Sequence, residues 1–272
     1  MARILPILGA SQPFDPSHRY TTSWILPPLL LAICRAAFAI YIFTAIFFIF
    51  GWNGAHGNPE QSRYSFSFFT SLGYWGLGFY FLFSSLHTFS YLATGKSWLQ
   101  RWPAALQVAH AVFYTTIVTF PILVTAVFWA LLYSGTWFPT SFQGWSNTSQ
   151  HALNTVFAAF EIFLTRTSPP PPAHLPFLVI LLALYLALAY LTHVTAGFYP
   201  YSFLDPNKGS GKLAGYILGI LAAACVIFGI VWGIIWIRRW LTESKWGMHG
   251  KLAKNTVVRD EEMMEMASER MK

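Results

Sequence analysis

Charged side chains are scarce in this sequence. Only 10% of the 272 residues are Asp, Glu, Lys or Arg, whereas 55% are hydrophobic and 18% are aromatic. A soluble domain carries about 25% charged residues, so this chain has too few to cover a water-facing surface of its size. The composition therefore excludes a soluble globular protein and predicts a membrane protein.

Cysteine is almost absent. The two cysteines, Cys34 and Cys225, both lie in apolar runs. Two isolated cysteines cannot make the disulfide framework of a small secreted domain, nor a cysteine-ligated metal site. His151 and His193 lack a third ligand at any helical spacing, so we expect no metal ion. Nothing in the sequence predicts a cofactor.

Acidic residues are rare outside the C-terminal tail. Four occur up to residue 240, and the other six lie in residues 241–272, the only stretch with the composition of a soluble protein. The formal net charge is +7, but the basic residues flank apolar runs instead of forming a patch. They are better explained as topology signals than as contacts to DNA or RNA, so no nucleic-acid partner is expected.

Long apolar runs are abundant. A transmembrane helix needs about 20 apolar residues to cross a hydrocarbon core about 30 Å thick. Six runs are long enough, at residues 24–50, 66–92, 104–134, 147–165, 175–195 and 213–237. The first lacks the short core and cleavage site of a signal peptide, so we expect it to remain as an anchor. The prediction is an all-α polytopic membrane protein, with a six-span domain at residues 1–240 and a charged cytosolic tail at 241–272.

The distribution of lysine and arginine predicts the orientation. With six spans, ten of these bases fall on the side that holds the N-terminus, the second and fourth loops and the near part of the tail, and three fall on the other side. Basic residues favour the cytosolic side of a membrane. Both termini are therefore expected in the cytosol, and the membrane is that of the endoplasmic reticulum or the plasma membrane.

Few ionisable side chains lie inside the predicted spans, and each is costly enough there to suggest a function. Arg35 and Glu161 have opposite charges near the middle of the first and fourth spans. They could form a buried ion pair, or Glu161 could orient a catalytic group. The sequence leaves both interpretations open.

Three polar side chains fall at a similar shallow depth on the non-cytosolic side. Thr70 and His151 each lie four residues inside a span, about 6 Å deep at 1.5 Å per residue, and His193 is two residues from the end of the fifth span. A hydroxyl beside a neutral imidazole suits nucleophilic catalysis, in which the imidazole removes the proton and the oxygen attacks an acyl carbon. The alternative is a threonine bonded to the preceding turn and a histidine with a structural partner.

Four segments at these positions resemble one known family. They are Ser65-Phe-Ser-Phe-Phe-Thr70, Phe120-Pro121 with Ala126-Val-Phe-Trp129 and Tyr133, Asn147-Thr-Ser-Gln-His151 with Glu161, and Thr192-His-Val-Thr-Ala-Gly197 with Tyr199-Pro-Tyr201 and Phe203-Leu204. In order and spacing they are similar to the androgen-induced and androgen-dependent tissue-factor-pathway-inhibitor-regulating proteins. That family consists of six-span membrane threonine hydrolases that cleave fatty acid esters of hydroxy fatty acids. The likeness covers residues 64–206.

The resemblance implies a carboxylic ester hydrolase that acts on lipids. Thr70 would be the nucleophile that forms an acyl-enzyme, and His151 would be the general base. Asn147, one turn before His151, would orient the imidazole. His193 would complete the polar layer or bind a carboxylate, and Glu161 is a further supporting candidate. The implied partners are the lipid substrate and the bilayer, and no protein partner follows.

Two other functions are compatible with the sequence. A non-catalytic relative could act as a membrane scaffold or regulator, with the segment Glu261-Glu-Met-Met-Glu-Met266 docking a partner as an amphipathic helix. Six spans also allow a channel or transporter, but the chain has no internal repeat and no pair of broken helices, which disfavours transport. Lipid ester hydrolysis is the leading prediction.

Overall fold

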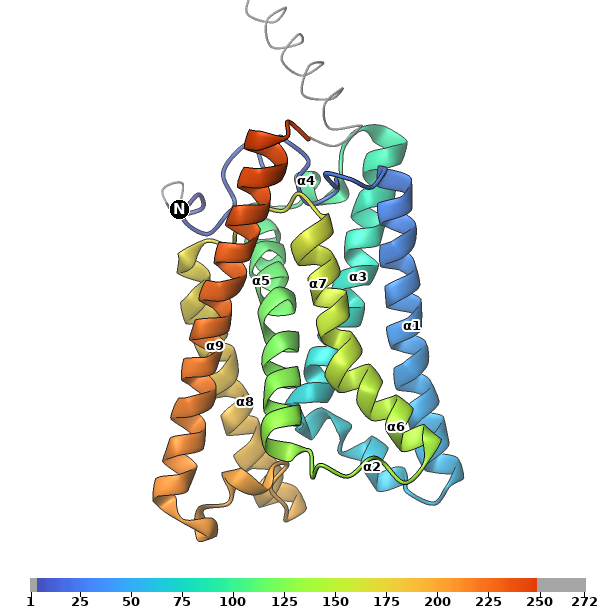
Figure 1. Ribbon diagram of the computed structural model, residues 1–272, viewed down its shortest axis with the longest axis vertical. Helices are drawn as coiled ribbons and strands as arrows, with labels where there is room; N and C mark the ends of the chain where they lie inside the picture. The colour runs from blue at the N-terminus through green and yellow to red at the C-terminus, as the bar shows by residue number, and fades with distance from the viewer. Residues whose placement is uncertain (1–3, 249–272) are drawn as a thin grey trace, which may run out of the picture.

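Helices form nearly all the regular structure of the chain. A computed structural model describes residues 4–248, and within that range there is no strand, only an isolated β-bridge between Ser23 and Thr165. Six long helical segments run side by side as a bundle (Figure 1). The prediction of an all-α protein is therefore confirmed.

The long segments follow the predicted apolar runs closely. They are α1 (Pro28–Ala55), α3 (Phe69–Thr94), α5 (Ala104–Val127), α6 with α7 (Ser141–Thr148 and Asn154–Leu164), α8 (Leu175–Ala196) and α9 (Ser210–Arg239). Three π-helical turns extend or join them, namely η2 (Phe128–Leu132) after α5, η3 (Ser149–Leu153) between α6 and α7, and η7 (Trp240–Lys245) after α9. The connections contain the short helices α2 (Pro59–Arg63) and α4 (Trp98–Arg101) and the 3-10 turns η1 (Ser65–Ser67), η4 (Pro172–His174), η5 (Ser202–Leu204) and η6 (Pro206–Lys208).

Proline and glycine mark several ends of these helices. Pro28 occupies the first position of α1, where its missing N–H removes no helical hydrogen bond. Gly95 and Gly197 follow α3 and α8 with φ of 72° and 78°, a left-handed conformation that strains any residue with a Cβ. The chain therefore leaves each of these helices sharply.

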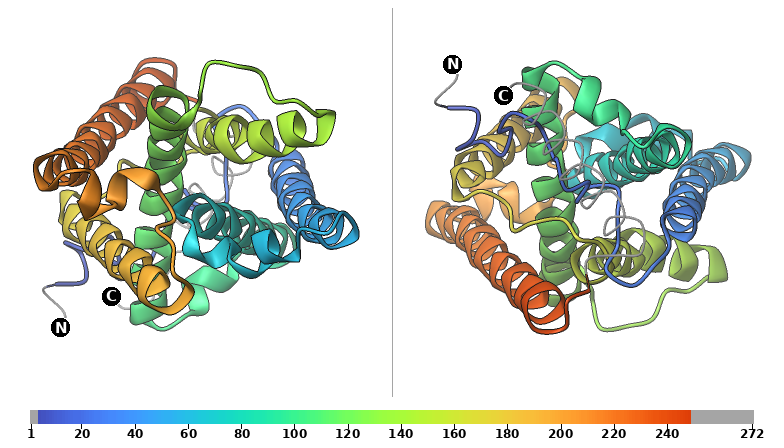
Figure 2. Two further views of the ribbon diagram at one scale, coloured as in Figure 1. Left: turned by 90° about the horizontal axis from the view of Figure 1, so that it is seen from below. Right: turned by 90° about the horizontal axis from the view of Figure 1, so that it is seen from above.

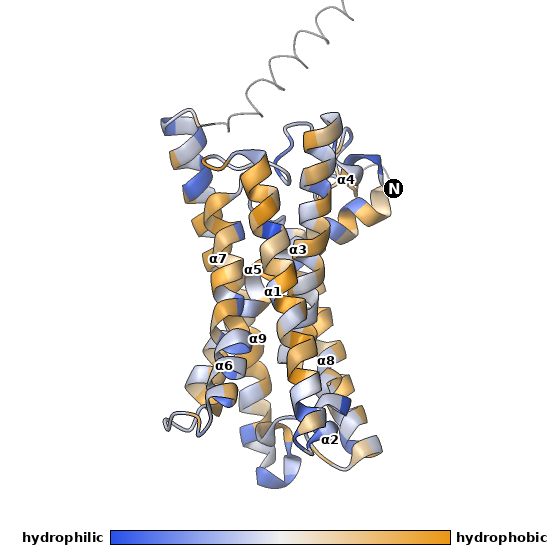
Figure 3. Cartoon of the chain, turned by 90° about the vertical axis from the view of Figure 1, so that its right-hand side faces the viewer, coloured by the Kyte–Doolittle hydropathy of each residue, from blue (hydrophilic) through white to orange (hydrophobic). Residues whose placement is uncertain are grey.

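Four segments are long and apolar enough to cross a membrane: Pro28–Ala55, Ala104–Leu132, Pro172–Ala196 and Ser210–Lys245. Apolar residues cover much of the bundle's sides (Figure 3). Length and hydropathy thus identify a membrane-embedded protein in which four of the described helices could cross a membrane, and the six spans predicted from the sequence stay a prediction. The other two candidates carry more polar residues. α3 buries Ser84, Ser85 and Thr88, and the joined α6–α7 contains Asn147, Gln150, His151 and Asn154, which lower the hydropathy of each segment.

α1 and α3 form the most extensive helix contact in the bundle. Gly78 of α3 lies against α1, where an added Cβ would come within 3.0 Å of Ile42 and 3.2 Å of Phe43. Beside this contact, Phe38 of α1 meets Phe81 of α3 edge to face, with ring centroids 5.3 Å apart. α8 packs mainly against α9, outside this core. The tight α1–α3 pair fixes the position of α3, and the looser packing of α8 leaves room for a cavity.

Arg35 and Glu161 form a buried ion pair between α1 and α7. Nε and Nη2 of the guanidinium each donate to one carboxylate oxygen at 2.8 Å, and both side chains are fully buried. Arg35 also donates to the Tyr20 carbonyl and the Thr88 hydroxyl, and the Tyr80 hydroxyl donates to Glu161. Of the two interpretations that the sequence left open, the structure shows the ion pair.

Residues 4–27 fold across the end of the bundle where α9 finishes, and we call this segment the N-terminal strap (Figure 2). Asp15 accepts hydrogen bonds from the backbone N–H groups of Arg19 and Tyr20. Arg19 in turn donates to both carboxylate oxygens of Glu243, and Arg166 lies 3.7 Å from the same carboxylate. The last turn of α9 is therefore part of the packed bundle. Residues 249–272, with the segment 261–266, lie outside the described residues.

Candidate active site

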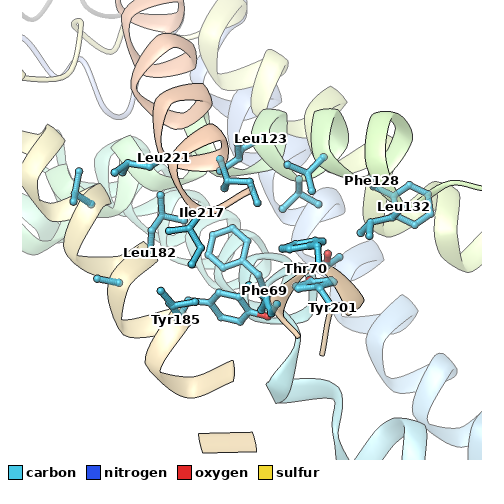
Figure 4. A pocket seen from close by; sticks show the side chains of 18 residues that line it. Phe69, Thr70, Leu123, Phe128, Leu132, Leu182, Tyr185, Tyr201, Ile217 and Leu221 are labelled. Atoms are coloured by element: carbon cyan, nitrogen blue, oxygen red, sulfur yellow. The ribbon is translucent and has the colours of Figure 1, made fainter. Parts of the chain in front are cut away.

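Thr70 is the second residue of α3, at the end of the bundle opposite the strap. The residue before α3, Phe68, is extended (φ −101°, ψ 131°), so the chain turns sharply from η1 into the helix. Thr70 is half-buried and lines a cavity (Figure 4). The first N–H groups of a helix lack carbonyl partners and carry partial positive charge. A negative charge that develops at Thr70 is therefore favoured.

The cavity at Thr70 lies between α5, α8 and α9, with the turn η5 beside it, and we call it the apolar cavity. Its volume is about 190 Å³. Apolar side chains from the three helices make up most of its wall (Figure 4), among them Leu123, Phe128, Leu182, Ile217 and Leu221. Thr70, Tyr185 and Tyr201 supply its hydroxyl groups. This lining suits a hydrocarbon chain with one polar group near Thr70.

A second and larger cavity, the polar vestibule, adjoins the same turn of α3. It has a volume of about 690 Å³ and is bordered by the end of α1, by α2, by the start of α3 and by α6. Its polar side chains include Asn53, Gln61, Ser71, Gln143, Asn147 and Gln150. Along the chain, Phe69 and Thr70 line the apolar cavity, whereas Phe68 and Ser71 line the vestibule. Thr70 therefore lies where an apolar compartment meets a polar one.

His151 lies in the π turn η3, which packs against α3. Its imidazole stacks on Phe128, with ring centroids 3.6 Å apart and planes 3° from parallel, and its carbonyl accepts a hydrogen bond from the Trp129 indole at 2.9 Å. Within the described residues, the buried Nδ1 of His151 has no hydrogen-bond partner. Phe128 also lines the apolar cavity that Thr70 faces. The structure thus places Thr70 and His151 in neighbouring elements, with no direct hydrogen bond between them among residues 4–248.

Two π turns meet at this place, η2 with Phe128 and η3 with His151. Such turns are rare and occur often at functional sites, because the extra residue changes the direction of the side chains that follow. No pattern in the sequence predicts them. An apolar run has the same composition whether its turns are α or π, so hydropathy locates the helix and not the defect.

Asn147 lines the vestibule, and among residues 4–248 no hydrogen bond joins it to the His151 imidazole that it was expected to orient. It is part of the vestibule wall, and its amide donates to the Gln143 carbonyl at 2.9 Å. In this conformation the amide N–H is committed to the backbone of α6 and not to the His151 ring. The one-turn spacing between residues 147 and 151 assumed a regular α-helix, whereas the π turn η3 begins between them.

Glu161 and His193 are separate from Thr70. Glu161 is held by Arg35, about 15 Å along the helix from His151 at 1.5 Å per residue. His193 stacks on Tyr199, with ring centroids 3.8 Å apart, and it is not among the residues that line the two cavities. The structure therefore places Thr70 and His151 in elements that pack against each other, and His151, like His193, is not among the residues that line the two cavities.

Tyr201 is a residue of this site to which the sequence reasoning gave no role. It lies in the loop between α8 and α9, and its hydroxyl makes polar contacts with the side chain and backbone of Thr70. Its ring is parallel to that of Phe203, with centroids 5.3 Å apart. The segment Tyr199-Pro-Tyr201 was one of those that carry the resemblance, but no spacing rule connects residue 201 with residue 70. Only the folded chain shows the contact.

A comparison with protein families identifies the chain. The model of the FAR-17a/AIG1-like proteins matches residues 32–233, well over half of the sequence, and the match includes both Thr70 and His151. Comparisons with curated proteins and with solved structures find no match. The matching family is the androgen-induced family that the four sequence segments resemble. The chain therefore belongs to the FAR-17a/AIG1-like family.

Proposed function

We propose that this protein is a membrane-embedded hydrolase of fatty acid esters of hydroxy fatty acids, with Thr70 as the nucleophile and His151 as the general base. One observation carries the proposal. The Thr70 side chain lies at the boundary between an apolar cavity and a polar vestibule, in an element that packs against a histidine whose Nδ1 is buried without a partner. Membership of the family supports the same assignment.

Such an ester has two parts of different chemistry. Its acyl chain is hydrocarbon, whereas the hydroxy fatty acid that leaves ends in a carboxylate. The apolar cavity suits the acyl chain, because each buried CH₂ group contributes about 0.8 kcal/mol. The vestibule offers neutral amides and hydroxyls to the carboxylate end of the hydroxy fatty acid, from Asn53, Ser71 and Asn147 among others. Its apolar wall, with Ile46 and Phe50, suits the chain of that acid, and among the described residues Glu60 is the one acidic residue of this wall. With the ester carbonyl at Thr70, the acyl chain lies in the apolar cavity and the hydroxy fatty acid lies in the vestibule.

The reaction has two steps. In the first, the Oγ1 of Thr70 attacks the ester carbonyl carbon, and the Thr70 proton passes to His151. The bond from that carbon to the alkoxy oxygen breaks, and His151 returns the proton to the leaving hydroxy fatty acid. In the second, His151 removes a proton from water as the water oxygen attacks the acyl carbon. The bond from that carbon to Oγ1 of Thr70 then breaks, His151 returns the proton to Oγ1, and the free fatty acid leaves.

His151 must reach the Thr70 proton for this reaction. The imidazole stacks on Phe128 in a turn that packs against α3, and the mechanism requires it to reach the Thr70 hydroxyl directly or through one water molecule. A neutral imidazole has one nitrogen that accepts and one that donates, and Nδ1 is not engaged by any described residue. General bases commonly align with their nucleophile only when substrate is bound.

The remaining candidates take roles that follow from their positions. Asn147 is part of the vestibule wall and would contact the polar half of the substrate. His193, stacked on Tyr199 at the end of α8, would meet the substrate carboxylate at the rim of the bundle. We assign Glu161 to the ion pair with Arg35 and to no catalytic step.

We propose that α3 and the joined α6–α7 also cross the membrane, which gives six spans. Both run beside the four apolar helices (Figure 1), and α3 alone has 26 residues. The strap and the end of α9 lie at one end of the bundle, where the basic residues are concentrated, so both termini face the cytosol. The active site then lies on the other side of the endoplasmic reticulum or plasma membrane.

The test is turnover of a fatty acid ester of a hydroxy fatty acid by the purified full-length protein in detergent. Thr70→Ala and His151→Ala should each abolish turnover and also labelling by a fluorophosphonate probe for nucleophilic hydroxyls. Matched controls are Thr195→Ala and His56→Ala, which remove the same side chains at the same end of the bundle but outside both cavities. Turnover that survives in either site variant contradicts the mechanism. No turnover by the wild type under any lipid condition would favour the scaffold instead.

A further inference from the structure

Attack by Thr70 on an ester turns the carbonyl oxygen into an oxyanion. Hydrolases stabilise this charge with hydrogen-bond donors about 2.7–3.1 Å from the oxygen, and loss of one donor lowers kcat by about a hundredfold or more. Because the carbonyl carbon must bond to Thr70, the donor must lie close to Thr70 as well.

Two donors in this region are already committed to the backbone. The Tyr185 hydroxyl donates to the carbonyl of Ser67 at 3.1 Å, and the Trp129 indole donates to the carbonyl of His151 at 2.9 Å. If either donor turned to an oxyanion, a partly buried carbonyl would lose its partner, which costs about 1–3 kcal/mol. Neither is therefore a good candidate.

Tyr201 is placed differently. Its hydroxyl contacts the side chains of Thr70 and Tyr185 and the backbone of Phe69 and Thr70, and both Tyr201 and Thr70 line the apolar cavity (Figure 4). The ring is held by a parallel contact with Phe203 at 5.3 Å and an edge contact with Phe68 at 5.8 Å. A ring packed in this way keeps its hydroxyl in position without a further loss of freedom when substrate binds.

We propose that the Tyr201 hydroxyl donates the hydrogen bond that stabilises the oxyanion formed by the attack of Thr70. This inference rests on the proposed function. In the tetrahedral intermediate the oxyanion is bonded to the carbon that carries Oγ1 of Thr70, so a hydroxyl that already contacts Thr70 needs only to turn its O–H bond to reach it. The phenol keeps its proton throughout. A neutral donor also suits an apolar cavity, where a charged one would be costly.

The protonation state of Tyr201 agrees with this role. Burial raises the pKa of the phenol, an effect larger than the opposing contacts with Thr70 and Tyr185. The hydroxyl therefore remains a donor across the neutral pH range.

The experiment compares Tyr201→Phe with Tyr190→Phe in the full-length protein, with a fatty acid ester of a hydroxy fatty acid as substrate. Each variant loses one tyrosine hydroxyl near the apolar cavity, but the Tyr190 hydroxyl donates to the Leu204 carbonyl, and no hydrogen bond within residues 4–248 joins it to Thr70. We expect Tyr201→Phe to lower kcat by about a hundredfold with KM changed less than about threefold, and Tyr190→Phe to leave both unchanged. Binding of a trifluoromethyl ketone analogue, which forms an oxyanion adduct, should weaken by a similar factor. Binding of the unreactive ether analogue should not.

The outcomes separate this inference from the proposed function, because Thr70→Ala is measured in parallel. If Tyr201→Phe keeps kcat within about threefold of the wild type while Thr70→Ala is inactive, the inference is overturned and the proposed function stands. If the wild type itself has no turnover, the proposed function fails. If Tyr201→Phe does not fold, a fluorinated tyrosine at position 201 replaces it. An unchanged kcat with this more acidic phenol overturns the inference, and a change that is absent at position 190 supports it.

Discussion

The two ends of the bundle use polar side chains in opposite ways. Toward the strap end the buried charged groups are paired, as in the ion pair between Arg35 and Glu161 and the contact between Arg19 and Glu243. At the site end Thr70 and His151 are neutral and half-buried, and the charged pair Glu60–Arg63 is exposed. The residues that stabilise the fold and the residues proposed to react therefore lie at different ends of the bundle.

The physical reason lies in what each kind of group requires. A buried charge is tolerated only when a partner and further hydrogen bonds replace the lost water, so Arg35 is surrounded by acceptors. A general base needs a nitrogen that is not already hydrogen-bonded, and the Nδ1 of His151 has no hydrogen-bond partner among the described residues. Groups of the first kind hold the helices together, and groups of the second kind are free to react.

The largest expected effect is the loss of activity without a loss of stability at the site end. Thr70→Val keeps the side-chain volume and removes the hydroxyl. We expect ester turnover to fall by more than about a thousandfold because the nucleophile is gone. The free energy of unfolding should change by less than about 1 kcal/mol, since the hydroxyl is only half-buried. Rate and unfolding midpoint are measured on one preparation, and a large drop in the midpoint would make Thr70 structural.

The opposite result is expected at the strap end. Glu161→Gln leaves the guanidinium of Arg35 buried without a countercharge, which should lower the free energy of unfolding by about 3–5 kcal/mol. Adding Arg35→Gln removes the unpaired charge and should recover part of the loss. Arg239→Gln is the control, because this half-exposed arginine lies 3.7 Å from Glu243 and its pairing is worth about 1 kcal/mol or less. Denaturant unfolding in detergent measures the free energy of unfolding of each variant. A loss below about 1 kcal/mol for Glu161→Gln would contradict the account.

A smaller effect sharpens the role of the apolar cavity. Leu182→Trp places a bulky ring in the wall that would face the acyl chain. We expect kcat/KM for long-chain esters to fall about tenfold relative to short-chain esters, because the lost space excludes methylene groups. Leu184→Trp, on an exposed position of the same helix, should keep the wild-type preference. If both variants retain that preference, the acyl chain does not bind in this cavity.

The smallest expected effect is a pH dependence confined to the strap. Burial raises the pKa of the Asp15 carboxyl from 3.8 to about 6, against the opposing effect of the backbone N–H groups and arginines beside it. The folded strap thus favours the protonated acid, so this contribution to docking is complete below about pH 4 and is lost as the pH rises through about 6. Hydrogen exchange of the strap amides, corrected for intrinsic rates, should show protection falling by less than about tenfold per pH unit between about pH 4 and 6 and levelling off above that. Asp15→Asn should remove the dependence, and protection that rises with pH would contradict it.

Much of the fold could be predicted from the sequence, because a membrane selects helices by length and hydropathy. The apolar run at 175–195 became α8 almost residue for residue. The fourth run was the least well predicted, since α6 begins at Ser141, six residues before the expected start. Residues 141–146 are too polar to count as part of a span but form a helix against the vestibule. Hydropathy therefore underestimates the length of the helix in this segment.

The candidate site was predictable only in part. Thr70 and His151 share a depth that can be counted from the ends of two spans, and their segments carry the family resemblance. The contacts that define the site are between elements far apart in the chain. The stacking of Phe128 on His151 depends on two π turns, and the approach of Tyr201 to Thr70 depends on the loop between α8 and α9. Neither the π turns nor the loop produces a periodic pattern in the sequence.

The central claim is that Thr70 becomes acylated during turnover. The most direct measurement uses an ester of the same acyl chain with a fast leaving group, so that acylation outruns deacylation, followed by an acid quench and mass spectrometry of the peptide that contains Thr70. The account predicts a mass increase equal to the acyl group on Thr70 in the wild type and no adduct in Thr70→Ala. Continued hydrolysis with an unmodified Thr70 peptide, or an adduct on another residue, would contradict it.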